Sequence, residues 1–210
     1  MCIIGLKPHG VKMPTKAEMR ACFTANRDGA GIAVVRDGTV KVYKGFMQWG
    51  LFEKAIDKLD IKPHELAMIH FRWGTAGENN RANTHPFPVW PSDKHQLRWT
   101  SYNTRAAMSH NGILGGYSSG YHWQAKKVDE YSDTQEFVYD HLRHVKFSEL
   151  LDTNGLAELE AKIGSANKLA IVTAEDKFIL VNEASGVWDS QTGMWWSNSG
   201  YRATARFMNV

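Results

Sequence analysis

The sequence has few cysteines, no long apolar run and no targeting signal, and each shortage narrows the kind of protein it encodes. Cys2 and Cys22 are the only cysteines among 210 residues, so a disulfide-rich secreted scaffold is not expected. No stretch reaches the roughly 18 consecutive apolar residues of a membrane helix. No signal peptide is recognisable either, because the apolar CIIGL gives way at once to Lys7, Pro8 and His9. These absences predict a cytoplasmic protein with no membrane partner.

A strong excess of one charge is also missing. The 25 basic and 22 acidic residues give a net charge of +3, and the basic residues are spread along the chain rather than gathered in a run. A nucleic-acid partner is therefore not expected. A composition that is 43% hydrophobic and 22% charged is typical of a folded globular protein. Without repeats or a low-complexity linker, the chain is predicted to form a single domain over residues 1–210.

The hydrophobic pattern predicts strands near both ends of the chain and helices between them. Asp37-Gly38 joins two strand-like runs, which is a strong hairpin signal. Ser132 and Gln135 form a capping box that opens a helix expected to continue through Val145. The polar stretch 74–94 shows no regular pattern. We further expect strands or hairpins at 2–6, 31–45, 66–73, 168–182 and 187–201, and helices at 14–23, 47–59 and 156–163. This order favours an α+β fold with antiparallel sheets.

Cys2 is the first candidate for chemistry, because removal of Met1 would place a thiol and a free amine on one residue. An α-amine has an ordinary pKa of about 7.7–8.0, so part of it is an uncharged base near neutral pH. A thiol is strongly nucleophilic and needs little activation. The alternative is that Cys2 is a small buried apolar residue. For Cys22, on the apolar face of the helix at 14–23, burial is the favoured interpretation.

Three downstream segments carry further candidates, each with an ordinary structural alternative. Arg72 is placed to bind a carboxylate with two hydrogen bonds, or to form a surface ion pair. Asn111 and Gly112 are placed to donate side-chain and backbone N–H groups to one oxyanion, or to make a simple turn. Asp133, at a helix start, is placed to accept a ligand ammonium, or only to interact favourably with the helix dipole.

Six motifs in a fixed order make the sequence resemble a known family. They are MC at the start, DGAGIAVV at 28–35, HFRWGT at 70–75, NTHPF at 83–87, SHNGIL at 109–114 and SDTQEF at 132–137. The series resembles the glutaminase domain of class II glutamine amidotransferases, which are N-terminal-nucleophile (Ntn) hydrolases. WWSNSGYR at 195–202 is similar to the last strands of compact members. The resemblance extends over nearly the whole chain.

The resemblance implies a fold and a set of site residues. The fold is a four-layer α-β-β-α sandwich of two antiparallel sheets, of the Ntn-hydrolase type. The implied roles are a nucleophile with its own amine as base, an oxyanion hole, and groups that hold the α-carboxylate and α-amine of glutamine. Cys2 matches the nucleophile, and Asn111 and Gly112 match the oxyanion hole. Arg72 and Thr75 match the groups that hold the α-carboxylate, and Asp133 matches the group that holds the α-amine. Trp73 matches either a gate beside the arginine or a residue that packs on the sheet.

Several positions depart from the family pattern. Ile3 stands where glycine usually follows the cysteine, and its branched side chain restricts the backbone beside the nucleophile. Ala25-Asn26-Arg27 precedes the DGAGI stretch where an arginine is common, and Ala76 replaces a histidine that often follows the threonine. No acceptor or synthase domain is recognised after the glutaminase unit.

The leading hypothesis is a cysteine amidohydrolase that converts glutamine to glutamate and ammonia through a thioester on Cys2, with a separate ammonia-accepting subunit as a possible partner. One alternative is hydrolysis of another γ-glutamyl amide at the same site, and a second is a catalytically weak binding or regulatory module. No cofactor and no metal are expected. His141 and His144 follow Asp140 in a D-H-x-x-H pattern, but no further ligands accompany them, so a helix-end interpretation is favoured.

Overall fold

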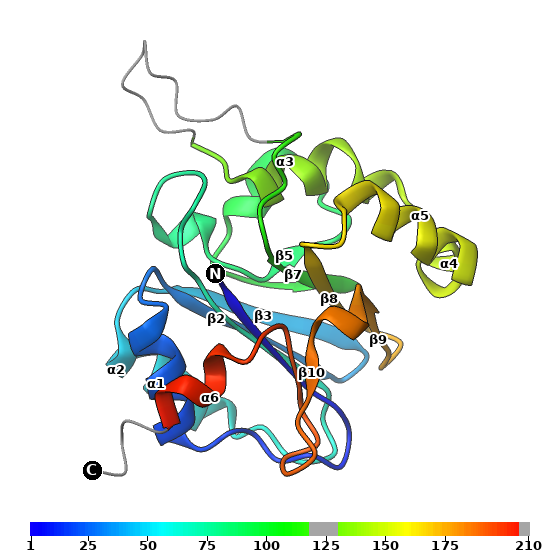
Figure 1. Cartoon of the computed structure of the whole chain (residues 1–210). Helices are drawn as coiled ribbons and strands as arrows, with labels where there is room; N and C mark the ends of the chain where they lie inside the picture. Colours follow the sequence, from blue (N-terminus) through cyan, green and yellow to red (C-terminus); the bar gives the residue numbers. More distant parts are fainter. Residues whose placement is uncertain (118–129, 206–210) are drawn as a thin grey trace.

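The computed structural model describes residues 1–117 and 130–205, and its strands form two antiparallel sheets that lie face to face (Figure 1). The larger sheet has the spatial order β10 (Val187–Trp188), β11 (Trp195–Trp196), β1 (Ile3–Lys7), β4 (Ala67–Phe71), β2 (Ala30–Arg36), β3 (Thr39–Phe46) and β6 (Ser101–Thr104). The smaller sheet has the order β5 (Phe87–Pro88), β7 (Ala106–Asn111), β8 (Lys168–Thr173) and β9 (Phe178–Val181).

Helices cover the outer face of each sheet (Figure 1). One apolar cluster joins the larger sheet to α1 (Lys16–Ala25), α2 (Trp49–Leu59) and α6 (Gly200–Ala205). A second lies between the sheets, and a third joins the smaller sheet to α3 (Asp133–Asp140), α4 (Phe147–Leu151) and α5 (Thr153–Ile163). Because a two-sided sheet must bury both faces, these three cores require four layers. The predicted four-layer α-β-β-α sandwich is confirmed.

The first strand shows how the sequence separates these cores. Ile4 and Leu6 point into the layer between the sheets, whereas Ile3 belongs to the cluster beneath α1 and α6. This follows from the two-residue period of a strand, whose successive side chains face opposite ways. Ile3 is therefore a core residue, and its branched side chain suits the extended backbone that β1 adopts.

The expected local signals are present at the element ends. Thr15 caps α1 and forms a capping box with Glu18, and Ser132 forms the predicted capping box at the start of α3. Asp37 and Gly38 both have positive φ, at 57° and 68°, and connect β2 to β3 as the predicted hairpin.

Two expectations need correction. The helix that begins after Ser132 ends at Asp140 rather than continuing through Val145, because the backbone leaves helical geometry at His141 and a 3₁₀ turn, η3 (Leu142–His144), buries Leu142. The stretch 74–94 is also not devoid of structure. Within it the Asn80 side chain caps the 3₁₀ turn η1 (Arg81–Asn83), and β5 pairs with β7.

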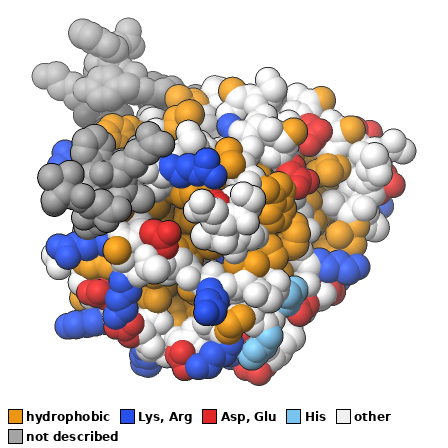
Figure 2. Space-filling view, turned by 60° about the horizontal axis from the view of Figure 1, so that its bottom comes forward, with side chains coloured by type: hydrophobic (Ala, Val, Ile, Leu, Met, Phe, Trp, Pro, Cys, Tyr) orange, Lys and Arg blue, Asp and Glu red, His pale blue; other side chains and the backbone are white. Residues whose placement is uncertain are grey.

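The surface and the helix lengths agree with the composition. On the face shown in Figure 2, basic and acidic side chains are interspersed rather than separated into patches. Within residues 1–117 and 130–205, none of the helices combines the length and apolar character that a membrane crossing requires.

Candidate active site

Cys2 lies directly before β1, at the point where that strand meets the end of β4. The antiparallel register pairs Ile3 with Phe71, which brings Cys2 beside Arg72 and Trp73. The Cys2 Sγ accepts a hydrogen bond from the Trp73 N–H at 3.4 Å and donates one to the Trp73 carbonyl at 3.5 Å. The N-terminus therefore lies where the two sheets come together (Figure 1).

Residues from separate segments of the chain meet at this point in one small cavity of about 20 Å³. All but one of the predicted site residues line it, namely Cys2, Arg72, Trp73, Thr75, Gly112 and Asp133. The exception is Asn111, which lies fully buried directly before Gly112. His85, His110, Ala76, Ser132 and Thr134 complete the lining.

Arg72 is a buried cation whose side-chain partners are neutral. The residue is 3% exposed. Its guanidinium donates to the Ala76 carbonyl at 2.9 Å and to the Asn79 Oδ1 at 3.1 Å. Asn79 in turn donates to Asp28 at 2.8 Å. In the described part of the chain, no carboxylate lies within ion-pair distance of Arg72. A buried guanidinium without an ionic partner suits the carboxylate of a ligand.

Asp133 lies deep in the site, whereas Trp73 lies near its surface. Asp133 is the first residue of α3 and is buried, with its carboxylate accepting the backbone N–H groups of Leu114 at 2.8 Å and of Thr134 at 2.7 Å. These bonds fix a negative charge in the cavity wall. Trp73 is 47% exposed, so its side chain lies at the surface of the site. Thr75 is exposed at the rim.

Asn111 ends β7 and Gly112 begins the loop that follows. The Asn111 Nδ2 donates to the Ser197 Oγ at 2.8 Å, and the buried Oδ1 has no hydrogen-bond partner among the described residues. Gly112 has a φ of +148°, and a Cβ there would collide with the Oδ1 of Asn167 and lie 2.8 Å from its Cγ. Only glycine fits this position.

We expect Gly112→Ala to disable the site, because the methyl group would have to displace a fixed side chain. Asn167 accepts a hydrogen bond from the His110 ring at 2.8 Å and donates to Ile163 at 2.6 Å, so it has little freedom to move. The expected cost is about 2–4 kcal/mol of unfolding free energy, measured by denaturant titration. Gly115→Ala is the matched control, because a Cβ at Gly115 meets nothing within 4 Å. Equal stabilities for the two variants would contradict the expectation.

The electrostatics of Cys2 call for a base. Burial raises the pKa of its thiol, while the Trp73 N–H, the Arg72 guanidinium and the N-terminal amine act in the lowering direction and Asp133 adds to the rise. Because the pKa of Cys2 remains raised, the thiol form predominates at neutral pH and attack requires a proton acceptor. Cys22 is fully buried and its pKa rises to about 12, which confirms that it packs in the core.

A layer of buried histidines was not anticipated, of which His85 and His110 line the cavity and His70 lies behind them. The His70 ring lies 4.2 Å from that of His85, and its Nε2 is 3.1 Å from the His110 carbonyl. Burial lowers the pKa of all three, to about 3 for His70, so each is neutral. The motifs HFRWGT, NTHPF and SHNGIL contain these residues, but their contact across the two sheets leaves no periodic signal in the sequence.

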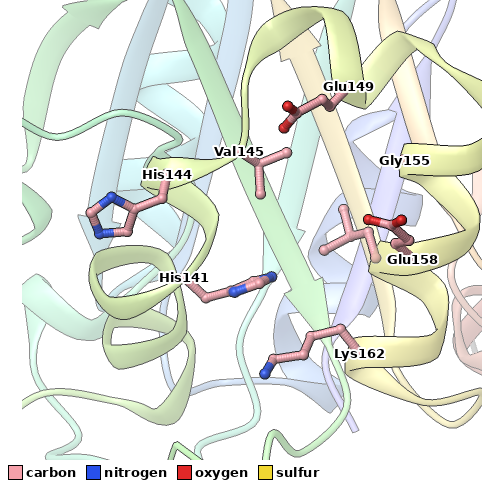
Figure 3. Close-up of a pocket in the computed structure, with 8 residues that line it drawn as sticks. His141, His144, Val145, Glu149, Gly155, Glu158 and Lys162 are labelled. Carbon is pink, nitrogen blue, oxygen red and sulfur yellow. The ribbon is translucent and has the colours of Figure 1, made fainter.

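A wider hollow of about 400 Å³ lies elsewhere, among η3, α4 and α5. His141 and Lys162 point toward it, and Glu149 of α4 and Glu158 of α5 lie beside it (Figure 3). None of its described lining residues is a Cys, Ser or Thr. Among the described residues, no group of three or more His, Cys, Asp or Glu side chains is arranged to hold a metal. His141 and exposed His144 lie at the end of α3, which confirms the helix-end interpretation.

Comparison with known proteins gives relatives in sequence and in structure, although no family profile matches the chain. Glutamine–fructose-6-phosphate aminotransferase (isomerizing) from Staphylococcus aureus is 30% identical over 158 residues, which cover 71% of this chain and 23% of that enzyme. The enzyme of the same name from Staphylococcus epidermidis is 30% identical over 132 residues, which cover 63% of this chain and 17% of that enzyme. The chain thus spans less than a quarter of the length of these curated relatives.

Two solved structures share the fold. Glutamine phosphoribosylpyrophosphate amidotransferase from B. subtilis superposes with a TM-score of 0.56 and 16% identity, covering 98% of this chain and 44% of that one. A structure described as the allosteric regulatory enzyme of purine biosynthesis superposes with a TM-score of 0.56 and 16% identity, covering 93% of this chain and 41% of that one. At this identity the likeness concerns the fold alone.

Proposed function

Because the chain is related in sequence to glutamine amidotransferases of class II and has their Ntn fold, we propose that it hydrolyses the side-chain amide of glutamine at Cys2. The observation that carries the proposal is that a thiol, a buried guanidinium and a buried carboxylate meet in one cavity, and that no described carboxylate lies within ion-pair distance of the guanidinium. Arg72 would hold the α-carboxylate and Asp133 the α-ammonium of glutamine. The amide would then lie toward Cys2.

The proposed reaction has two steps on the thiol. After removal of Met1, the Cys2 amine takes the thiol proton and Sγ bonds to the amide carbon, whose oxygen becomes an oxyanion held by Asn111 and the Gly112 N–H. The C–N bond then breaks, and the amine passes its proton to the departing nitrogen, which leaves as ammonia. Water attacks the resulting thioester, the C–S bond breaks, and glutamate and the thiol are restored.

We expect the wall of this partly open cavity to move when substrate enters. A volume of about 20 Å³ holds about one water molecule and not glutamine. We propose that the exposed segment of Trp73 and Thr75 opens to admit it, with Trp73 acting as a gate. Ammonia would then diffuse away or pass to a separate acceptor subunit.

A second candidate substrate is a γ-glutamyl amide of a larger amine. Ala76 supports it, because this small side chain lines the cavity where a histidine is common in the resembling family. The thiol chemistry would be the same, and only the leaving amine would differ. Ammonia release from glutamine, measured beside amine release from γ-glutamyl anilide and γ-glutamyl ethylamide, separates the two.

The test of the function is labelling with the glutamine-like electrophile 6-diazo-5-oxo-norleucine. Intact mass should first show that Met1 is absent. Peptide mapping should then place one adduct on Cys2, with glutamine slowing its formation, and Cys2→Ala should not be labelled. The Cys22→Ala variant is the matched control and should react as the parent does, because Cys22 is fully buried. Label elsewhere would refute this function, and retention of Met1 in an active enzyme would refute the Cys2 amine as the base.

A further inference from the structure

The segment that follows β11 connects the two halves of the proposed site. Ser197 donates its backbone N–H to the Ile4 carbonyl at 3.0 Å, and its Oγ accepts the Ile4 N–H at 2.9 Å. These two hydrogen bonds to Ile4 hold the backbone and the hydroxyl of Ser197 in place, and Ser197 is fully buried. The same Oγ is 2.8 Å from the Asn111 amide of β7, which belongs to the other sheet. One hydroxyl therefore links the nucleophile's strand to the oxyanion asparagine.

Counting donors and acceptors shows which way the Asn111 amide must face in the reaction. With Nδ2 on the Ser197 Oγ, the Asn111 Oδ1 has no donor, and no described contact takes the hydroxyl proton of Ser197. A half-turn about Cβ–Cγ exchanges the amide nitrogen and oxygen. Ser197 then donates its proton to Oδ1, and both N–H groups of Nδ2 face the opposite way, where an acceptor is needed. An unsatisfied buried donor is costly until such an acceptor arrives.

We propose that Ser197 is a positioning residue, whose hydroxyl holds the Asn111 amide with Nδ2 directed at the oxyanion of the tetrahedral intermediate. This inference rests on the proposed function. Asn198 extends the link, because its Nδ2 donates to the Cys2 carbonyl at 2.8 Å and its Oδ1 accepts the Gly200 N–H at 2.9 Å. The two adjacent residues thus hold the nucleophile and the oxyanion donor in one frame.

The prediction is that Ser197→Ala lowers kcat for glutamine by about 10- to 100-fold with KM changed less than about threefold. The effect is on kcat because the oxyanion forms only after substrate is bound. Asn111→Ala should lower kcat by about 100- to 1,000-fold, as removal of an oxyanion donor does. If Ser197 acts through Asn111, the double variant should match Asn111→Ala within about threefold, because no amide remains to be oriented. Ser197→Thr keeps the hydroxyl and should restore most of the activity.

Ser109→Ala is the matched control, since Ser109 is also fully buried and lies on β7, but its Oγ has no hydrogen-bond partner in the described residues. It should retain the parent kcat, and melting temperatures confirm that all variants are folded at the assay temperature. A Ser197→Ala kcat equal to that of the parent, or an equal further loss when Asn111 is already alanine, overturns the positioning role. If the parent itself neither turns over glutamine nor is labelled at Cys2, the proposed function has failed instead.

Discussion

Replacement of Cys2 with alanine is expected to lower glutamine hydrolysis by at least about four orders of magnitude, without unfolding the protein. The thiol is the one nucleophile in the cavity for which an adjacent base is proposed. Its loss removes the covalent step rather than weakening it. Stability should change little, because the two hydrogen bonds between Sγ and the Trp73 backbone, at 3.4 and 3.5 Å, involve sulfur, which is a weak donor and a weak acceptor. Ammonia release under saturating glutamine measures the first effect and denaturant unfolding the second.

One companion protein makes this result specific to the proposed mechanism. An N-terminal Gly-Ser extension leaves the thiol in place but keeps the Cys2 nitrogen in a peptide bond, so it removes only the base. We expect this protein to be nearly as inactive as Cys2→Ala, because burial raises the pKa of Cys2 and little thiolate forms unaided. Full activity in the extended protein would mean that another group removes the thiol proton.

The extent to which the sequence predicts this molecule depends on the range of each interaction. The β2–β3 hairpin and the starts of α1 and α3 are visible because Asp37-Gly38, Thr15 and Ser132 act within a few residues. The end of α3 is set by the burial of Leu142 in the folded chain, and there the periodic pattern predicts the wrong helix end. The layered fold itself follows from motif order, since strands such as β8 are buried on both faces and have no alternation.

The site divides in the same way. Arg72, Asn111 and Gly112 stand out because each chemical group belongs to a short motif. Ser197 and Asn79 do not, because their importance depends on contacts that only the folded chain makes. Ser197 meets Asn111 from 86 residues away, and Asn79 connects Arg72 to Asp28 from another loop. Residues that orient a catalytic group carry no chemistry of their own to recognise.

The buried histidine layer predicts a steep loss of stability in mild acid. Burial lowers the pKa of His70, His85 and His110 in the folded state, with Arg72 and Lys44 lowering it further for His70 and His85, while Asp133 opposes the shift at His110. The unfolded histidines bind protons near their ordinary pKa of about 6.5. The unfolded state therefore takes up more protons as pH falls, so stability is full above about pH 6.5 and is lost below it.

With His70 and His85 neutral in the folded state, the free energy of unfolding should fall by about 2.7 kcal/mol per pH unit between about pH 6 and pH 5, and the lowered pKa of His110 adds to this loss. Denaturant titrations followed by tryptophan fluorescence at several pH values in that range measure the slope. The range lies above the titration of Glu65, whose pKa in the folded state is lowered to about 2 chiefly by its hydrogen bond to Arg36 and which adds a loss of the same sign at lower pH. A slope that corresponds to the uptake of about one proton or less on unfolding would mean that the histidine layer is already charged in the folded state.

His85→Phe assigns that slope to the layer. The imidazole of His85 packs 4.2 Å from His70 and 4.5 Å from Phe87, and neither of its nitrogens has a hydrogen-bond partner in the described chain, so a phenyl ring preserves the packing and removes one titrating group. The slope should fall by up to about 1.4 kcal/mol per pH unit, the contribution of one titrating group. His144→Asn, at an exposed histidine, should leave it unchanged. Because the two substitutions differ in burial, equal slopes would trace the acid sensitivity to groups outside the layer.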